Sequence, residues 1–244
     1  MNNRNEKIRN ILVPILSVIM GLVLGAILML SFGYNPITGY GSMLDAALGN
    51  QRSIGETLRQ ATPLIFTALG FSVANSAGFF NIGLSGQALA GWLTSVWVAL
   101  LLPELPKLVL LPLAVLLGAL AGAVAAAIPG LLRAYFGTSE VIVTIMMNYI
   151  LLYVSTYMLQ SVMSESLRTS LDSSNQISAN ASLRLPWLTQ LFGGSRVNAG
   201  LILALIALVL VWFLMKKTTL GYEIRSVGLN PFASEYAGMS SHRT

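Results

Sequence analysis

The stretch that decides the fold lies near the amino terminus, where residues 11–32 read ILVPILSVIMGLVLGAILMLSF. A helix rises about 1.5 Å per residue, so a run of this length can cross the roughly 30 Å hydrocarbon core of a bilayer. A secretory signal peptide also follows basic residues, here Arg4, Lys7 and Arg9. Its apolar core, however, is only about 7–15 residues long. The run therefore predicts a first transmembrane helix.

The composition of the whole chain agrees with a membrane protein. Of 244 residues, 55% are hydrophobic and 9% are charged, whereas about 25% are charged in an average soluble domain. Lipid must then cover much of the surface, and in lipid only helices and closed barrels satisfy their own backbone hydrogen bonds. The apolar runs are continuous rather than alternating, which favours helices. We predict an all-α, polytopic helical membrane protein.

Outward from the first run, the chain contains five further apolar runs, so we expect about six transmembrane helices. Pro129-Gly130 is expected to end the fourth span, and Gly118 and Gly122 within it, four residues apart, predict close helix packing. Residues 34–60 are expected to form a loop with a short amphipathic piece, and 161–198 a longer polar loop. The predicted spans cover residues 11–32, 63–77, 87–102, 108–128, 141–160 and 199–215.

The charge distribution predicts the orientation of these spans. Lys and Arg accumulate on the cytoplasmic side of membrane proteins, and Lys216-Lys217 directly follows the sixth run. Six spans place both termini on this side. We therefore expect a cytoplasmic tail at 1–10, a membrane domain at 11–215 and a cytoplasmic segment at 216–244. The net charge of +5 then reflects this bias, and we expect no nucleic-acid partner.

Several classes of chemistry find no support in the sequence. No ionisable residue lies within the six apolar cores, which disfavours a proton- or sodium-coupled carrier. The only histidine is His242, there is no cysteine, and no G-x-x-x-x-G-K-[ST] loop binds ATP. We predict no catalytic residue, no metal site and no cofactor. Energy for uphill transport would come from a partner.

A first polar place is residues 78–87, GFFNIGLSGQ, between two apolar runs. Its glycines, with Asn81 and Gln87, predict backbone that leaves the helix near membrane depth, where it must be buried in protein or line a wet cavity. An ordinary cytoplasmic turn is an equal alternative at this point.

A second polar place is the fifth run, where Thr144, Asn148 and Ser155 share one helical face. Uncharged polar groups can line a pathway for a neutral solute, or they can hydrogen-bond to a neighbouring helix. Packing is favoured for Thr144 and Ser155, and a pathway for Asn148. The candidate pathway residues are Asn81, Gln87, Thr144 and Asn148.

A third polar place is the tail, residues 218–239. Asn230 is suited to the N-cap of a short helix, Pro231 to its first position and Gly238 to its end. The tail thus predicts a helix presented to a partner, with a solvated tail as the alternative.

Together the three places resemble a known family. Residues 78–87 are similar to the F-N-I-G-x-x-G-Q signature of permeases in the ribose, branched-chain amino acid and nucleoside class of ABC importers. Residues 137–150, GTSEVIVTIMMNYI, resemble their G-x-x-E-V-I-x-T-I-M-x-N-Y-I segment, and residues 219–238 their cytoplasmic element. The second segment points to the nucleoside (simple sugar) branch, although Ser85 stands where that branch often carries an acidic residue.

The resemblance implies the membrane-spanning permease subunit of an ATP-driven importer in the bacterial plasma membrane, moving a nucleoside or simple sugar. It implies three partners besides the lipid bilayer: cytoplasmic ABC ATPase subunits, a second permease subunit, and an extracellular solute-binding lipoprotein. The chain itself would be a transport subunit and not an enzyme. The residues implied in coupling to the ATPase are Gly221, Arg225, Gly228, Asn230, Phe232, Glu235, Tyr236 and Gly238.

Such permeases usually continue through further spans, so we expect the coupling segment at 216–244 to be incomplete and the chain truncated at its carboxyl end. Two readings of other classes stay open beside the permease. One is a secondary carrier or channel for a small neutral solute. The other is a membrane assembly protein that transports nothing.

Overall fold

The computed structural model describes residues 2–240, with side chains from residue 12 onward. This part of the chain is mostly helical, with one two-stranded antiparallel hairpin that pairs Arg168 with Ser174 and Ser170 with Ser173. The elements are α1 (Asn2–Ser31), α2 (Pro36–Leu48), α3 (Gln51–Ser76), α4 (Leu84–Leu101), α5 (Lys107–Phe136), α6 (Glu140–Tyr157), a π-helical turn (Met158–Val162), 3-10 turns (Glu165–Leu167 and Ala179–Ala181), β1 (Arg168–Ser170), β2 (Ser173–Ser174), α7 (Pro186–Leu191), α8 (Gly200–Lys217), α9 (Thr219–Leu229) and α10 (Pro231–Tyr236).

The chain divides into two compact units, and the first contains α1, α2 and the start of α3, with residues 190–195. The Asn35 side chain accepts a hydrogen bond from the Ile37 N–H (2.9 Å) and so caps α2, with Pro36 at its first position. Asn50 accepts from the Ser53 N–H (2.8 Å) in the same way at the start of α3. The prediction of a loop over residues 34–60 is therefore wrong, because these caps begin two helices there.

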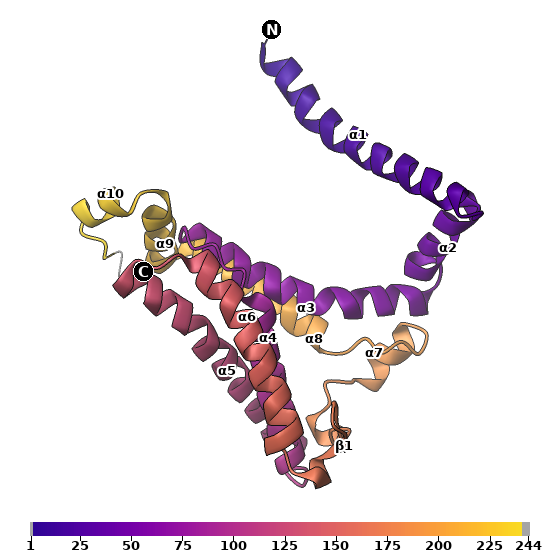
Figure 1. The fold of residues 1–244 in the computed structure, drawn as a ribbon, viewed down its shortest axis with the longest axis vertical. Coiled ribbons are helices and arrows are strands. Elements are labelled where there is room, and N and C mark those ends of the chain that lie inside the picture. Colours follow the sequence, from indigo (N-terminus) through magenta and orange to yellow (C-terminus); the bar gives the residue numbers. More distant parts are fainter. Residues whose placement is uncertain (1, 241–244) are drawn as a thin grey trace. The chain divides into compact units, whose positions relative to one another are not determined.

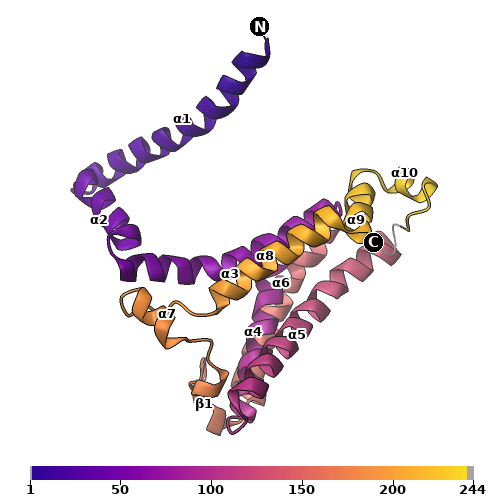
Figure 2. The same cartoon turned by 180° about the vertical axis from the view of Figure 1, so that it is seen from behind.

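The second unit is built around α4, α5 and α6, which run side by side (Figures 1 and 2). A Cβ added at Gly91 of α4 would lie 3.0 Å from the Gly118 carbonyl oxygen of α5, and one added at Gly122 would lie 3.3 Å from the Gln87 carbonyl oxygen. The Ser95 hydroxyl donates to the Ala114 carbonyl (2.9 Å) across the same interface. The predicted glycine pair therefore brings two helix backbones into contact.

Helix α5 is longer than predicted. It continues through Pro129-Gly130 and ends at Phe136, where Gly137 has a φ of 63° and donates its N–H to the Arg133 carbonyl (3.0 Å). A proline removes one helical hydrogen bond, but Pro129 is fully buried. Packing against its neighbours thus lets the helix continue past the position where the sequence predicted its end.

Five helical stretches in the described part of the chain are long and apolar enough to cross a membrane: Leu12–Ser31, Leu84–Leu101, Lys107–Phe136, Glu140–Val162 and Gly200–Lys217. They overlap five of the predicted spans. The remaining predicted span, 63–77, lies almost wholly within the second half of α3 and stays a prediction. Many large apolar side chains of the five apolar stretches are exposed, among them Leu116, Leu120 and Leu210, as expected for surfaces that face lipid.

Within the second unit, helices α9 and α10 and the first part of the long loop, residues 161–189, lie at opposite ends of the helices. The Asn180 side chain donates to the Leu105 carbonyl (3.1 Å), which places the loop beside the α4–α5 connection. Helices α9 and α10 lie at the other end of α5 (Figure 1). The sides of the membrane on which the loop and the tail lie stay a prediction.

Candidate functional site

The chain leaves helical geometry between α3 and α4, over residues 77–83. Gly78 has a φ of 73°, the Phe79 N–H donates to the Ala74 carbonyl (2.9 Å), and the Gly78 N–H donates to the Asn75 carbonyl (3.0 Å). This is the Schellman pattern, in which a left-handed glycine closes a helix. The predicted break in the helix is confirmed here.

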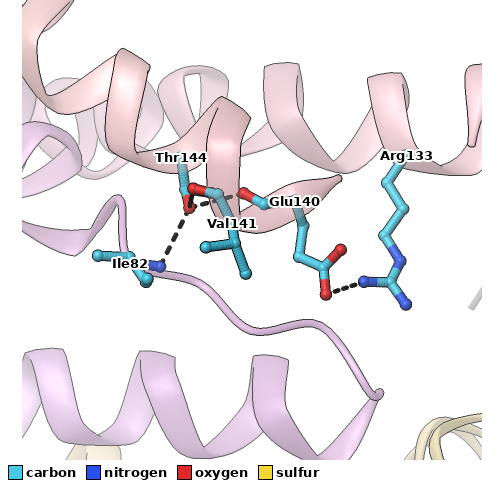
Figure 3. A network of polar contacts seen from close by, with 5 residues as sticks. All are labelled: Ile82, Arg133, Glu140, Val141 and Thr144. Carbon is cyan, nitrogen blue, oxygen red and sulfur yellow. Dashed lines mark hydrogen bonds and ion pairs between the residues drawn. The ribbon is translucent and has the colours of Figure 1, made fainter. Parts of the chain in front are cut away.

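Helix α6 holds this irregular segment through two polar side chains. The Thr144 hydroxyl accepts from the Ile82 N–H (3.2 Å) and donates to the Glu140 carbonyl (2.7 Å), as Figure 3 shows. The Asn148 amide accepts from the Gly86 N–H (2.9 Å) and donates to the Ile82 carbonyl (2.9 Å). Both side chains thus satisfy backbone groups that have no helical partner.

Asn81 and Gln87 form a pair of side-chain amides beside that contact. Each amide nitrogen donates to the other amide oxygen, at 3.2 Å in both directions. The Asn81 oxygen also accepts from the Gly83 N–H (2.8 Å), and the Asn81 side chain is buried. The structure therefore brings all four candidate pathway residues together around one short segment.

A cavity of about 1140 Å³ opens on this segment. Its walls come from α3, α4, α5, α8, α9 and the first residue of α10, and most of its lining side chains are apolar. Asn81 and Gln87 line it, together with the aromatic rings of Phe66 and Phe79. Thr144 and Asn148 stand behind the lining, so a direct contact of either with solute stays a prediction. An apolar hollow with a few polar groups is the usual form of a small-molecule site.

One ion pair lies at the edge of the cavity, and its two residues were not among the candidate site residues predicted from the sequence. Arg133, from the last turn of α5, pairs with Glu140, in the first turn of α6, and the two side chains point toward one another in Figure 3. The Arg133 guanidinium also lies 5.8 Å from the centroid of the Phe79 ring. Arg133 is the one charged residue among those that line the cavity, and Glu140 balances it. The sequence does contain a signal for this pair. Arg133 precedes the helix-ending Gly137, and Glu140 follows it at the start of the next helix. A cation at a helix C-terminus and an anion at a helix N-terminus each interact favourably with the helix dipole.

The predicted coupling segment forms two helices, α9 and α10. Thr218 caps α9 by accepting from the Gly221 N–H (3.1 Å), and a Cβ at Gly221 would overlap the Leu214 carbonyl oxygen of α8. A Cβ at Gly228 would likewise overlap the Ser76 carbonyl oxygen at the end of α3. Both glycines therefore permit contacts of backbone on backbone.

Helix α10 has the predicted ends. Asn230 accepts from the Ala233 N–H (3.1 Å), Pro231 is at the first position, and Gly238 follows with a φ of 84°. Phe232 is 84% exposed and Tyr236 is 99% exposed, so the helix presents two aromatic rings outward. Among the other predicted coupling residues, Arg225 lies on α9 and has one buried guanidinium nitrogen without a hydrogen bond in the described structure, and Glu235 lies on α10. The last four residues of the predicted coupling segment, 241–244, lie outside the described residues.

Comparison with known proteins gives one matching family, described as the permease component of branched-chain amino acid transport systems, over residues 53–244. A nucleoside ABC transporter permease protein, NupB, of Lactococcus lactis subsp. cremoris is 54% identical over 98% of this chain and 66% of its own length. The guanosine ABC transporter permease protein NupP of Bacillus subtilis is 43% identical over 96% and 66%. The glucose ABC transporter permease protein TsgB13 of Haloferax volcanii is 35% identical over 94% and 61%. No solved structure matches.

The chain thus spans about two thirds of the length of these relatives. The five apolar helices in the described part of the chain and the relatives together identify a multi-pass protein of the plasma membrane, which confirms the predicted fold class and location. The cytoplasmic position of the amino terminus stays a prediction.

Proposed function

We propose that this chain, which belongs to the family of permease components of branched-chain amino acid transport systems, is the membrane-spanning subunit of an ATP-driven importer. The proposed solute is a nucleoside. The cavity beside Asn81 and Gln87 is the observation that carries this proposal. Two relatives, named as permeases for nucleosides and guanosine, support the choice of solute.

The chemistry of the cavity fits a neutral solute with hydrogen-bonding groups. Its polar lining consists of two side-chain amides, which donate and accept hydrogen bonds without carrying charge. Its single cation, Arg133, is already paired with Glu140, so a charged solute would be desolvated without a free partner of opposite charge. Phe66 and Phe79 add flat apolar surface. A nucleoside has both an aromatic base and neutral polar groups.

The tail supplies a route by which a partner acts on the cavity. The exposed rings of Phe232 and Tyr236 fit a groove on a cytoplasmic ATPase, because aromatic side chains dominate binding at protein interfaces. Helix α9 contacts the end of α3 at Gly228, and its Ile224 and Val227 line the cavity. A movement of the tail is thereby transmitted to the cavity wall. A second permease subunit and an extracellular solute-binding lipoprotein complete the proposed assembly.

The test is uptake of radiolabelled guanosine by cells that express the complete transporter, compared with cells that lack this chain. Depleting ATP while the proton gradient is maintained should abolish the uptake that depends on this chain. An uncoupler applied while ATP is maintained should leave it largely intact. Uptake that collapses with the proton gradient would identify a secondary carrier instead, and equal uptake without the chain would refute a transport role.

A sugar is the second candidate solute, because one relative is named as a glucose permease. An excess of unlabelled glucose or ribose distinguishes the two candidates. Neither sugar should reduce guanosine uptake if the solute is a nucleoside.

A further inference from the structure

The amide pair in the cavity wall has a property that most surface amides lack: its orientation is fixed by the backbone. A carboxamide carries an oxygen that accepts two hydrogen bonds and a nitrogen that donates two. The Gly83 N–H can only donate, and it donates to the Asn81 side chain at 2.8 Å. The atom at that position must therefore be the Asn81 oxygen.

The orientation of Asn81 then fixes that of Gln87. With its oxygen toward Gly83, Asn81 directs its nitrogen to the Gln87 oxygen (3.2 Å), and its oxygen also receives the Gln87 nitrogen (3.2 Å). A Gln87 amide turned by 180° would place nitrogen against nitrogen and oxygen against oxygen. Because both contacts would then be lost, the flipped state is disfavoured.

A count of hydrogen bonds shows what remains for a solute. The Asn81 oxygen already accepts two bonds, from Gly83 and from Gln87, and the Asn81 side chain is only 7% exposed. Gln87 is partly exposed and has used one N–H and one lone pair of its oxygen within the pair. It keeps one donor and one acceptor, and it lines the cavity.

We propose that Gln87 selects the solute by hydrogen-bonding to the polar edge of its base, and that Asn81 is the positioning residue that fixes the orientation of the Gln87 amide. The inference rests on the proposed function and deepens it, since it assigns recognition to the base rather than to the sugar. Amides of Gln and Asn are the side chains that commonly pair with base edges. The aromatic walls at Phe66 and Phe79 suit the faces of the same ring system.

The test measures equilibrium binding to the purified complex of this permease with its partner permease and ATPase subunits in lipid nanodiscs, without the solute-binding protein. The probes are radiolabelled guanosine and purine riboside, which has the same ring skeleton and sugar but no exocyclic oxo or amino group. Gln87→Met should raise the Kd for guanosine about tenfold. The Kd for purine riboside should change less than threefold.

Asn81→Asp tests the positioning role. It keeps an acceptor for the Gly83 N–H but removes the donor to the Gln87 oxygen, so the orientation of the Gln87 amide is no longer fixed. The Kd for purine riboside divided by the Kd for guanosine should therefore fall toward one. Ser95→Ala is the matched control on α4, because the Ser95 hydroxyl bonds the Ala114 carbonyl away from the cavity. Its ratio should equal that of the unchanged protein.

Three results would overturn the proposal. One is unchanged guanosine binding in Gln87→Met, and a second is an equal loss of both probes in that variant, which would indicate a structural role only. The third is competition by ribose as strong as competition by guanosine, which would move recognition to the sugar. None of these results bears on whether uptake in cells depends on ATP and on this chain. Failure of this inference and failure of the proposed function are therefore distinguishable.

Discussion

Replacing Gly228 with alanine probes the contact that joins α9 to the end of α3. The added Cβ would overlap the Ser76 carbonyl oxygen and would lie 2.9 Å from both the Ala77 carbonyl carbon and the Gly78 nitrogen. All three are backbone atoms, which cannot rotate away as a side chain can. Since carbon and oxygen lie about 3.3–3.6 Å apart in close favourable contacts, α9 must move away by more than about 1 Å.

The cost follows from two opposing effects. Overpacking a tight contact costs about 1–3 kcal/mol, whereas alanine is favoured over glycine within a helix by up to about 1 kcal/mol. Because the added atom meets backbone, the upper part of the first range applies, about 2–3 kcal/mol, and the net loss in the free energy of unfolding is about 1–2 kcal/mol. For a chain of this size such a loss lowers the Tm by about 2–8 °C.

The assay is thermal unfolding of the purified protein in detergent, followed by tryptophan fluorescence. Gly41→Ala is the matched control, because Gly41 lies inside α2 and a Cβ there meets no atom within 4 Å. Its Tm should equal or exceed that of the unchanged protein. If Gly228→Ala behaves like Gly41→Ala, the backbone contact and the route from tail to cavity that depends on it are refuted.

Three further predictions concern the cavity edge and the tail. Arg133→Met and Glu140→Gln should each lower the free energy of unfolding and the Tm. The double variant should lose less free energy of unfolding than the sum of the two single losses, by about 0.5–1 kcal/mol for a partly exposed pair. Additive losses in this double-mutant cycle would contradict the pairing. Asn230→Ala removes the cap of α10 at a cost of about 1 kcal/mol, so amide hydrogen exchange at residues 233–236 should accelerate, while Asn230→Asp should retain protection. Replacing Phe232 and Tyr236 with alanine should leave the Tm unchanged, because both rings are exposed, yet should reduce co-purification of the ATPase; unchanged co-purification would remove α10 from the proposed interface.

The parts of the fold that depend on local signals were predictable from the sequence. Apolar runs predicted the positions of five stretches that are long and apolar enough to cross a membrane, and Asn230, Pro231 and Gly238 predicted both ends of α10. Gly78 gave the end of α3. In each case the decisive interaction lies within a few residues of chain, where capping and helix length act.

The parts that depend on tertiary contacts were not predictable in the same way. The helix through Pro129 persists because its neighbours bury that residue, which no local pattern reveals. The hydrogen bonds of Asn148 depend on the position of Ile82 and Gly86, both about sixty residues away along the chain, and its role in a pathway stays a prediction. The Arg133–Glu140 pair was visible as two charges at facing helix ends, but its place at the cavity edge required the arrangement of α5, α6 and α3.

The bonds from Thr144 and Asn148 have a mechanical consequence. They carry the Ile82 N–H, the Ile82 carbonyl and the Gly86 N–H, so three backbone groups at the entry to α4 are fastened to a single face of α6. If α6 turns about its own axis, it must either drag residues 82–86 with it or break all three bonds together. Asn81 and Gln87 flank those residues. A rotation of α6 therefore changes the position and orientation of the amide pair in the cavity wall.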